Sequence, residues 1–217
     1  MLRAALFDMD RTLVRRQTAS LYVRYQRDIG EASLLDMARV AYWVAQYTLG
    51  VIDVESIAMR SLAPLAGTAE QTLIDRCDGW FDRYVREHVT DAGRHAVAYH
   101  QARGDVVAIV TGATPYAARP LARMLGIEHV LASELERDDA RNFTGRPERP
   151  LCFGAGKITR ALALAERLGF ALEDAVFYSD SYTDLPLLSH VAEPVVVNPD
   201  ARLRREARRR GWRVERW

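Results

Sequence analysis

The sequence predicts an α/β fold, a doubly wound parallel sheet with a small all-helical domain inserted after the first strand. Short apolar runs alternate with segments of helical periodicity through the second half of the chain. Several of these runs end in small polar or acidic residues, as strands do where they lead into a site at the carboxyl edge of a parallel sheet. Between the first and second runs, apolar residues recur only at helical spacing.

Size and composition describe an ordinary globular protein. The chain has 217 residues, of which 49% are hydrophobic and 27% charged, enough for one domain with a sizeable insertion. Thirty basic and 29 acidic residues leave a formal charge of +1, which gives no electrostatic reason to expect nucleic acid or a membrane as partner. Two cysteines cannot form a disulfide framework, and neither a signal peptide nor a membrane span is recognisable. We therefore expect a cytoplasmic protein.

The first half of the chain predicts one strand followed by a helical domain. Residues 3–8 are apolar and end in acid, as a buried strand would. Residues 16–85 then show helical spacing in about four segments, with Asp53 and Thr68 as expected N-caps. We assign this block to a cap domain above the first strand, and residues 1–15 and 86–217 to an α/β core.

The second half alternates helices and strands. A polar, turn-rich stretch at 133–154 interrupts the series and predicts a short hairpin and a loop. We expect helices at about 91–103, 115–125, 156–168, 183–189 and from 200 onwards, and strands at 105–111, 128–132, 175–179, 194–197 and, at an edge, 212–215. Six arginines between 202 and 210 are expected to form a solvated helix face.

Two aspartates follow the first strand, in the pattern Asp8-Met9-Asp10-Arg11-Thr12. Two carboxylates beside one phosphate can divide the chemistry, with one ionised as nucleophile and the other protonated as general acid. The pair alone is equally typical of N-cap or turn aspartates.

Three further patterns follow later strands or precede a helix. Thr111-Gly112 offers a hydroxyl and an unhindered amide to a phosphate oxygen. Lys157 opens a helix after a glycine-bearing loop and can neutralise phosphate charge. Asp180 and Asp184 offer hard oxygens to Mg²⁺. Each has an ordinary alternative as a turn, a solvated lysine or a pair of caps.

In this order the patterns resemble the four motifs of the haloacid dehalogenase superfamily of phosphatases. Asp8 to Thr12 looks like the first motif, Thr111 the second, Lys157 the third, and Asp180 to Asp184 the fourth. The helical insertion after the first motif is similar to the small cap of the subgroup that contains phosphoserine phosphatase. The resemblance covers the whole chain and implies a Rossmann-like core.

By this resemblance, Asp8 is the nucleophile and Asp10 the general acid and base. A Mg²⁺ ion is expected on Asp8, the backbone carbonyl of Asp10, and Asp180. The presence of Asp10 favours phosphatases and mutases over dehalogenases, which lack it.

The resemblance also assigns the remaining site residues. Thr111 and the Gly112 amide are expected to hold the phosphate, and Lys157 to bridge the phosphate and the nucleophile. Asp184 is expected to orient Lys157, with Thr12 in a supporting position.

The substrate is less well defined than the chemistry. The fourth motif begins Ser179-Asp180 where Gly-Asp is usual. Gln17 stands where phosphoserine enzymes carry the glutamate that reads the substrate ammonium, and Arg60 falls near their carboxylate-reading arginine. Glutamine cannot supply that charge, so we expect Gln17 and Arg60 to set a specificity not tuned to phosphoserine.

The sequence therefore predicts a Mg²⁺-dependent phosphomonoesterase that acts on a small phosphorylated metabolite through an aspartyl-phosphate. Candidate substrates are amino-alcohol or amino-acid phosphates, such as histidinol phosphate or phosphoserine. Alternatives on the same core are a phosphotransferase or mutase, and a non-catalytic phospholigand-binding module. The oligomeric state is not defined by the sequence.

Overall fold

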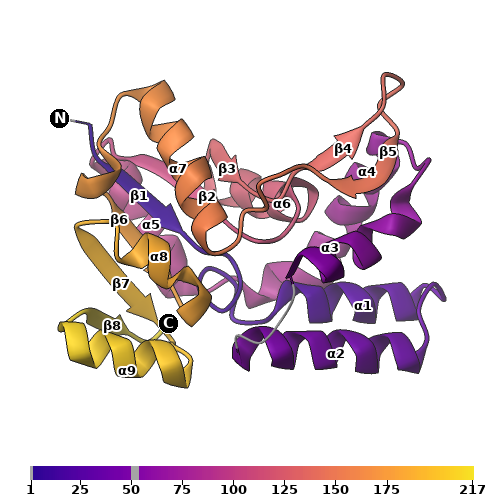
Figure 1. Cartoon of the computed structure of the whole chain (residues 1–217), viewed down its shortest axis with the longest axis horizontal. Coiled ribbons are helices and arrows are strands. Elements are labelled where there is room, and N and C mark those ends of the chain that lie inside the picture. The colour runs from indigo at the N-terminus through magenta and orange to yellow at the C-terminus, as the bar shows by residue number, and fades with distance from the viewer. Residues whose placement is uncertain (1, 50–53) are drawn as a thin grey trace.

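Short apolar segments pair side by side into one parallel sheet (Figure 1). The computed structural model describes residues 2–49 and 54–217. In the described residues the sheet has six strands in the order β3-β2-β1-β6-β7-β8, and every pairing is parallel. Their bounds are β1 Ala4–Phe7, β2 Val106–Val110, β3 His129–Leu131, β6 Val176–Ser179, β7 Glu193–Val197 and β8 Arg213–Glu215. The predicted doubly wound sheet is confirmed, and its last strand lies at an edge.

Helices cover both faces of the sheet, because side chains alternate along each buried strand. Ala5 and Phe7 of β1 pack with one apolar cluster that includes residues of α5 and α6, whereas Ala4 and Leu6 pack with another that includes residues of α7 and α9. The core helices are α5 Asp91–Ala102, α6 Pro115–Leu125, α7 Ala155–Leu168, α8 Leu185–Leu188 and α9 Ala201–Arg210.

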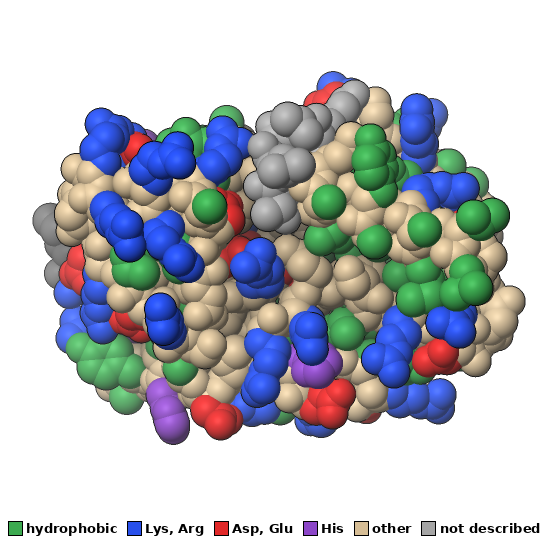
Figure 2. Space-filling view, turned by 90° about the horizontal axis from the view of Figure 1, so that it is seen from below, with side chains coloured by type: hydrophobic (Ala, Val, Ile, Leu, Met, Phe, Trp, Pro, Cys, Tyr) green, Lys and Arg blue, Asp and Glu red, His purple; other side chains and the backbone are tan. Residues whose placement is uncertain are grey.

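The basic C-terminal helix α9 presents its arginines to solvent. Figure 2 shows Lys and Arg side chains gathered on the side of the molecule that carries α9. Arg209 and Arg210 both pair with Glu206 on the same helix, and Leu203 and Ala207 are buried against the sheet. This is the amphipathic arrangement expected for a solvated helix face. No helix in the two described ranges is both long and apolar enough to cross a membrane.

The segment between β1 and α5 is helical, as predicted, and lies beside the sheet (Figure 1). Its described α-helices are α1 Thr18–Asp28, α2 Leu34–Leu49, α3 Val54–Leu62 and α4 Glu70–Trp80. The expected N-cap at Thr68 is wrong: Ala69 caps α4, because its backbone first pairs with Asn142 in an antiparallel bridge. The other expected cap, Asp53, lies outside the described residues.

The predicted hairpin packs on these helices rather than on the sheet. Its strands are β4 Leu135–Arg137 and β5 Phe143–Pro147. Phe143 exchanges backbone hydrogen bonds with Gly67 and Thr68, at 2.8 and 2.9 Å. The division of the chain into a cap at residues 16–85 and a core stays a prediction. The hairpin, which lies outside that range, packs against the helical segment.

A buried carboxylate joins the helical segment, the hairpin and the core. Glu70 of α4 accepts a hydrogen bond of 2.6 Å from the Tyr116 hydroxyl of α6 and pairs with Arg137 and Arg141 of the hairpin. We call these four residues the Glu70 cluster. The Tyr116 hydroxyl and the two guanidinium groups lower the pKa of Glu70 from 4.5 to about 2, against the opposing effect of burial.

The lowered pKa predicts how stability depends on pH. The ionised Glu70 stabilises the fold above pH 4.5, and this contribution is lost as the pH falls from 4.5 towards 2. We expect Glu70→Gln to lower the free energy of unfolding most near neutral pH. Urea unfolding of both proteins should show the gap closing as the pH falls through that window. A gap that does not change with pH would contradict the assignment.

Candidate active site

Three strand ends bring the predicted residues to one edge of the sheet. Phe7 of β1 lies opposite Ile109 of β2 on one side and Tyr178 of β6 on the other. Asp8, Thr111 and Asp180 follow these strands, and all three are buried. The ends of β2, β1 and β6 therefore form one polar site, as parallel topology requires.

A buried lysine joins two of the site's carboxylates. The Lys157 ammonium lies 2.7 Å from Oδ1 of Asp8 and 2.7 Å from Oδ2 of Asp184, and the lysine side chain is only 1% exposed. An ammonium in this position fixes both carboxylates and leaves its charge directed at the end of β1.

The loop before α7 explains how Lys157 reaches the site. Gly154 adopts a positive φ of 53°, which side chains other than glycine rarely tolerate. A Cβ at Gly156 would lie 1.9 Å from the Leu151 carbonyl oxygen, so the loop closes only around a glycine. Both glycines thus fix the start of the helix that carries Lys157.

The loop after β6 is held by the Ser179 hydroxyl at its start and by Asp200 at the start of α9. Ser179 donates a hydrogen bond of 2.7 Å to Oδ2 of Asp184 and accepts one of 3.2 Å from the Ser181 amide. Asp200, the N-cap of α9, accepts a 2.7 Å bond from the Tyr182 amide. The loop that carries Asp180 and Asp184 is therefore fixed both by hydrogen bonds within the loop and by the N-cap residue of α9.

Asp10 is held by the first helix of the insertion. The Thr18 amide at the start of α1 donates to Oδ1 of Asp10 at 2.7 Å. Burial raises the pKa of Asp10, and the hydrogen bond from Thr18 opposes that rise. A carboxyl group with a raised pKa can hold a proton for a leaving group.

Negative charge at the site exceeds the positive charge that faces it. Burial raises the pKa of Asp8 to about 7 despite Lys157, and burial together with the charge of Asp8 raises the pKa of Asp180 well above its usual range. Arg11 approaches Asp180 only to 3.5 Å, and Oδ1 of Asp184 is buried without a hydrogen-bond partner among the described residues. A divalent cation would compensate this charge.

The donor set fits Mg²⁺ rather than a metal that needs a full protein cage. Within residues 2–49 and 54–217, no cluster of three or more His, Cys, Asp or Glu side chains is arranged to hold a metal. The expected set needs only two carboxylates, Asp8 and Asp180, with the Asp10 carbonyl. Mg²⁺ typically binds through one or two carboxylates and keeps water and phosphate as its other ligands.

The predicted phosphate-binding and supporting residues lie beside this group. The Thr111 hydroxyl accepts a 3.2 Å hydrogen bond from the Ala113 amide, and Gly112 is exposed at the turn. A Cβ at Gly112 would meet the Cys152 carbonyl at an ordinary 3.7 Å, so sterics alone do not require a glycine there. The buried Thr12 hydroxyl has no hydrogen-bond partner among the described residues. The roles of Thr111, Gly112 and Thr12 stay predictions.

The two predicted specificity residues occupy different positions. Gln17 is the N-cap of α1, directly before the amide that holds Asp10, and is half-buried. Arg60 is exposed in the last turn of α3. Gln17 is therefore coupled to the site through its backbone, whereas the position of Arg60 on the surface of α3 gives no such coupling.

Comparison with known proteins identifies the family. A model of haloacid dehalogenase-like hydrolases matches residues 5–189. The chain belongs to this family. A histidinol-phosphatase of Neisseria meningitidis serogroup C (strain 8013) is 32% identical over 216 residues, which cover 97% of this chain and 96% of that protein. A phosphoserine phosphatase of Mycobacterium tuberculosis (strain ATCC 25618 / H37Rv) is 34% identical over 216 residues, which cover 97% and 70%.

Solved structures agree with this assignment. A protein of unknown function from Bordetella pertussis Tohama I superposes with a TM-score of 0.88 at 31% identity, covering 99% of this chain and 98% of that one. A substrate-bound phosphoserine phosphatase shares the fold, with a TM-score of 0.72 at 20% identity over 95% and 90% of the two chains. The predicted family and enzyme class, a hydrolase of the haloacid dehalogenase type with phosphatase relatives, are confirmed.

Several residues of this hydrolase site were not identified from its motifs. Ser179 is more than a small replacement for glycine, because its hydroxyl binds Asp184. Arg11 lies between the first-motif aspartate Asp10 and Thr12, and it approaches Asp180. Asp200 belongs to another helix, and only its position as a helix N-cap is readable from the sequence.

The loop before α7 leaves no room for a side chain at Gly156, so a substitution there should disturb the site. Gly156→Ala places a methyl group against the Leu151 carbonyl and should displace Lys157. We expect a loss of about 1–3 kcal/mol in unfolding free energy from overpacking and a fall in kcat of roughly a hundredfold. Thermal melting and steady-state kinetics measure both.

Gly79→Ala is the matched control. Gly79 lies in α4, and a Cβ added there would meet no atom within 4 Å, so the same substitution should leave kcat unchanged. Equal activities in the two variants would show that the loop does not position Lys157.

Proposed function

We propose that this hydrolase is a Mg²⁺-dependent phosphomonoesterase that cleaves small phosphorylated metabolites through an aspartyl-phosphate at Asp8. The observation that carries the proposal is the contact of Lys157 with both Asp8 and Asp184 at 2.7 Å in a buried site. A carboxylate attacks an anionic phosphate only if nearby positive charge offsets their repulsion. Lys157 is placed to supply that charge at the attacking atom.

In the first half-reaction, a carboxylate oxygen of Asp8 forms a bond to phosphorus. The bond from phosphorus to the leaving oxygen breaks, and Asp10 donates its proton to that oxygen. The raised pKa of Asp10 supports this role, because the group then holds a proton at higher pH than an exposed aspartate. The product is an alcohol and a phosphorylated Asp8.

In the second half-reaction, water attacks the phosphorus of the aspartyl-phosphate. Asp10, now ionised, accepts the proton of the water, and the bond between phosphorus and the Asp8 oxygen breaks. Inorganic phosphate leaves and both aspartates return to their starting states. Thr111 and the Gly112 amide hold the phosphate oxygens through both steps.

Asp8, Asp180 and the Asp10 carbonyl would hold Mg²⁺, which when bound neutralises charge on the phosphate and orients it for in-line attack. Asp184 keeps Lys157 directed at Asp8 through their 2.7 Å contact. The buried Ser179 hydroxyl fixes the rotamer of Asp184 in turn.

The substrate is proposed to be an amino-alcohol or amino-acid phosphate. Support comes from the relatives named histidinol-phosphatase and phosphoserine phosphatase. Residues 16–85 are proposed to act as a cap that covers the leaving group, since α1 reaches Asp10 through Thr18. Both cysteines are free and buried, which supports a place in the reducing cytoplasm.

Asp8→Asn tests the nucleophile. The amide has nearly the same shape but cannot attack phosphorus, so kcat with an aryl phosphate should fall about a thousandfold or more. The melting temperature should show that the fold is retained. Activity above roughly a tenth of wild type would contradict nucleophilic attack by Asp8.

Removal and exchange of the metal test the cofactor. Chelation should abolish turnover and added Mg²⁺ should restore it. Ca²⁺ should inhibit, because its larger and looser shell misplaces the attacking carboxylate. Asp180→Asn should raise the Mg²⁺ concentration needed for half-maximal rate. Full activity in excess chelator would contradict the metal-dependent mechanism.

A further inference from the structure

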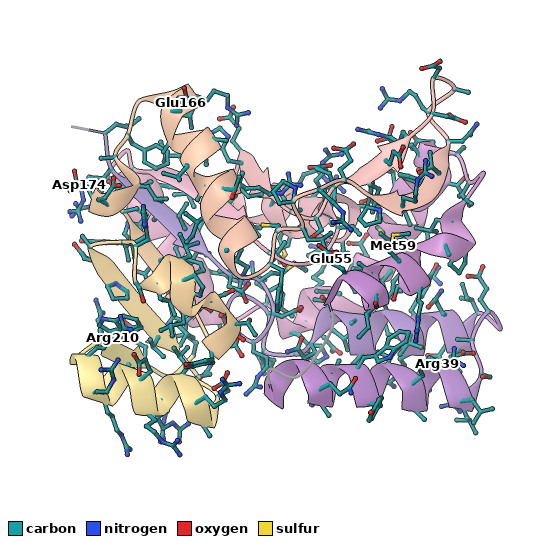
Figure 3. All side chains as sticks on the ribbon, in the orientation of Figure 1. Arg39, Glu55, Met59, Glu166, Asp174 and Arg210 are labelled. Carbon is teal, nitrogen blue, oxygen red and sulfur yellow. The ribbon has the colours of Figure 1, made fainter. Side chains whose placement is uncertain are left out.

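A cavity lies between the helical segment and the loop that leads to Lys157. It has a volume of about 200 Å³ and is lined by Glu55, Met59, Glu136, Arg146, Pro147, Arg149 and Leu151. The walls come from α3, the hairpin and the loop after it. Figure 3 shows Glu55 and Met59 on α3, on the side that faces the hairpin.

The loop from 149 to 157 connects this cavity to the phosphate site. Leu151 lines the cavity, and its carbonyl lies against Gly156, the residue before Lys157. The next residue, Cys152, lies against Gly112 at the end of β2. The same loop therefore borders both the cavity and the phosphate site.

Charged groups in the cavity differ in how firmly they are paired. Glu136 accepts bonds from Arg146 at 2.7 and 3.1 Å and from the Thr144 hydroxyl at 3.0 Å, so its charge is already matched. Glu55 meets Arg149 at 2.9 Å, and these two side chains are 58% and 72% exposed. An exposed pair of this kind contributes little to stability, so a ligand can replace either partner.

The charge of the reacting centre decides which partner a ligand replaces. Asp8, Asp180 and Asp184 face one lysine at the phosphate site, and even with Mg²⁺ bound the charge of the substrate phosphate leaves the site negative. A cationic leaving group reduces this excess, whereas an anionic one increases it. Glu55 is thus the favoured contact, and Arg149 is the group that the ligand displaces.

We propose that Glu55 is a specificity-determining residue that provides the counter-charge for an ammonium or imidazolium on the leaving group. The proposal rests on the phosphomonoesterase function above and names its substrate class as cation-bearing phosphate esters. It also accounts for the neutral Gln17 beside Asp10: the missing carboxylate is supplied from α3 rather than from the N-terminus of α1. Met59, Pro147 and Leu151 provide apolar surface for the carbon chain.

Two substrates that differ only in charge test the proposal. Phosphoethanolamine ends in an ammonium, and propyl phosphate has a methyl group in the same position. The wild-type enzyme should prefer phosphoethanolamine in kcat/KM. Glu55→Gln should lower kcat/KM for phosphoethanolamine by roughly ten- to a hundredfold and leave propyl phosphate unchanged.

Arg149→Gln provides a test of opposite sign. It removes the cation that competes for Glu55, so KM for phosphoethanolamine should fall while propyl phosphate is unaffected. Glu166→Gln is the matched control, because Glu166 is an exposed carboxylate of α7 on the far side of the core (Figure 3). It should change neither substrate.

The outcomes separate this inference from the function on which it rests. Equal losses on both substrates in Glu55→Gln would mean that Glu55 only fastens α3 to the loop, and would overturn the proposal. So would a wild-type enzyme that hydrolyses propyl phosphate as well as phosphoethanolamine. Absence of turnover with any phosphate ester would instead overturn the phosphomonoesterase function itself.

Discussion

The structure depends on one buried ammonium held between two carboxylates. Lys157 is 1% exposed, and its contacts with Asp8 and Asp184 match its charge in a place that water does not reach. Removing one partner of such a group leaves an uncompensated buried charge, which costs about 3–5 kcal/mol. The end of β1, the loop before α7 and the loop after β6 must therefore keep their positions together. The geometry of the proposed catalytic site and the local stability of the fold depend on the same contacts.

The helical segment is attached to this core unequally. On one side the Glu70 cluster joins α4, α6 and the hairpin through a carboxylate that is only 6% exposed. On the other side α3 meets the core loop through the exposed pair of Glu55 and Arg149. Near the middle, the Thr18 amide of α1 holds Asp10. The buried Glu70 cluster holds α4 and the hairpin against α6, whereas the exposed pair lies at the wall of the cavity.

Local sequence patterns predicted most of the fold and the main site residues. Strand ends, helix periodicity and the order of the motifs are local signals, and the family assignment from them is confirmed. The structure brings Asp8, Lys157 and Asp184 into contact, although their catalytic roles stay predictions. Contacts between distant segments were not readable: Asp200 behind the Asp180 loop, the Ser179 hydroxyl on Asp184, and the hairpin on α4. The expected cap at Thr68 failed for the same reason, because the pairing of Ala69 with Asn142 is set by the hairpin.

Nucleophilic attack by Asp8 is tested most directly by finding which residue carries the phosphoryl group. Enzyme quenched during turnover and reduced with borohydride should contain homoserine at position 8, because borohydride reduces an aspartyl-phosphate but not a free carboxylate. Mass spectrometry of the peptide that contains Asp8 and Asp10 locates the change. With an aryl phosphate, whose leaving group departs without a general acid, Asp10→Asn should increase the yield of homoserine by slowing hydrolysis of the intermediate. Homoserine at position 8 alone is the predicted result. Reduction at another residue, or a pre-steady-state reaction that proceeds with no phosphoenzyme, would contradict attack by Asp8, the carboxylate that Lys157 holds.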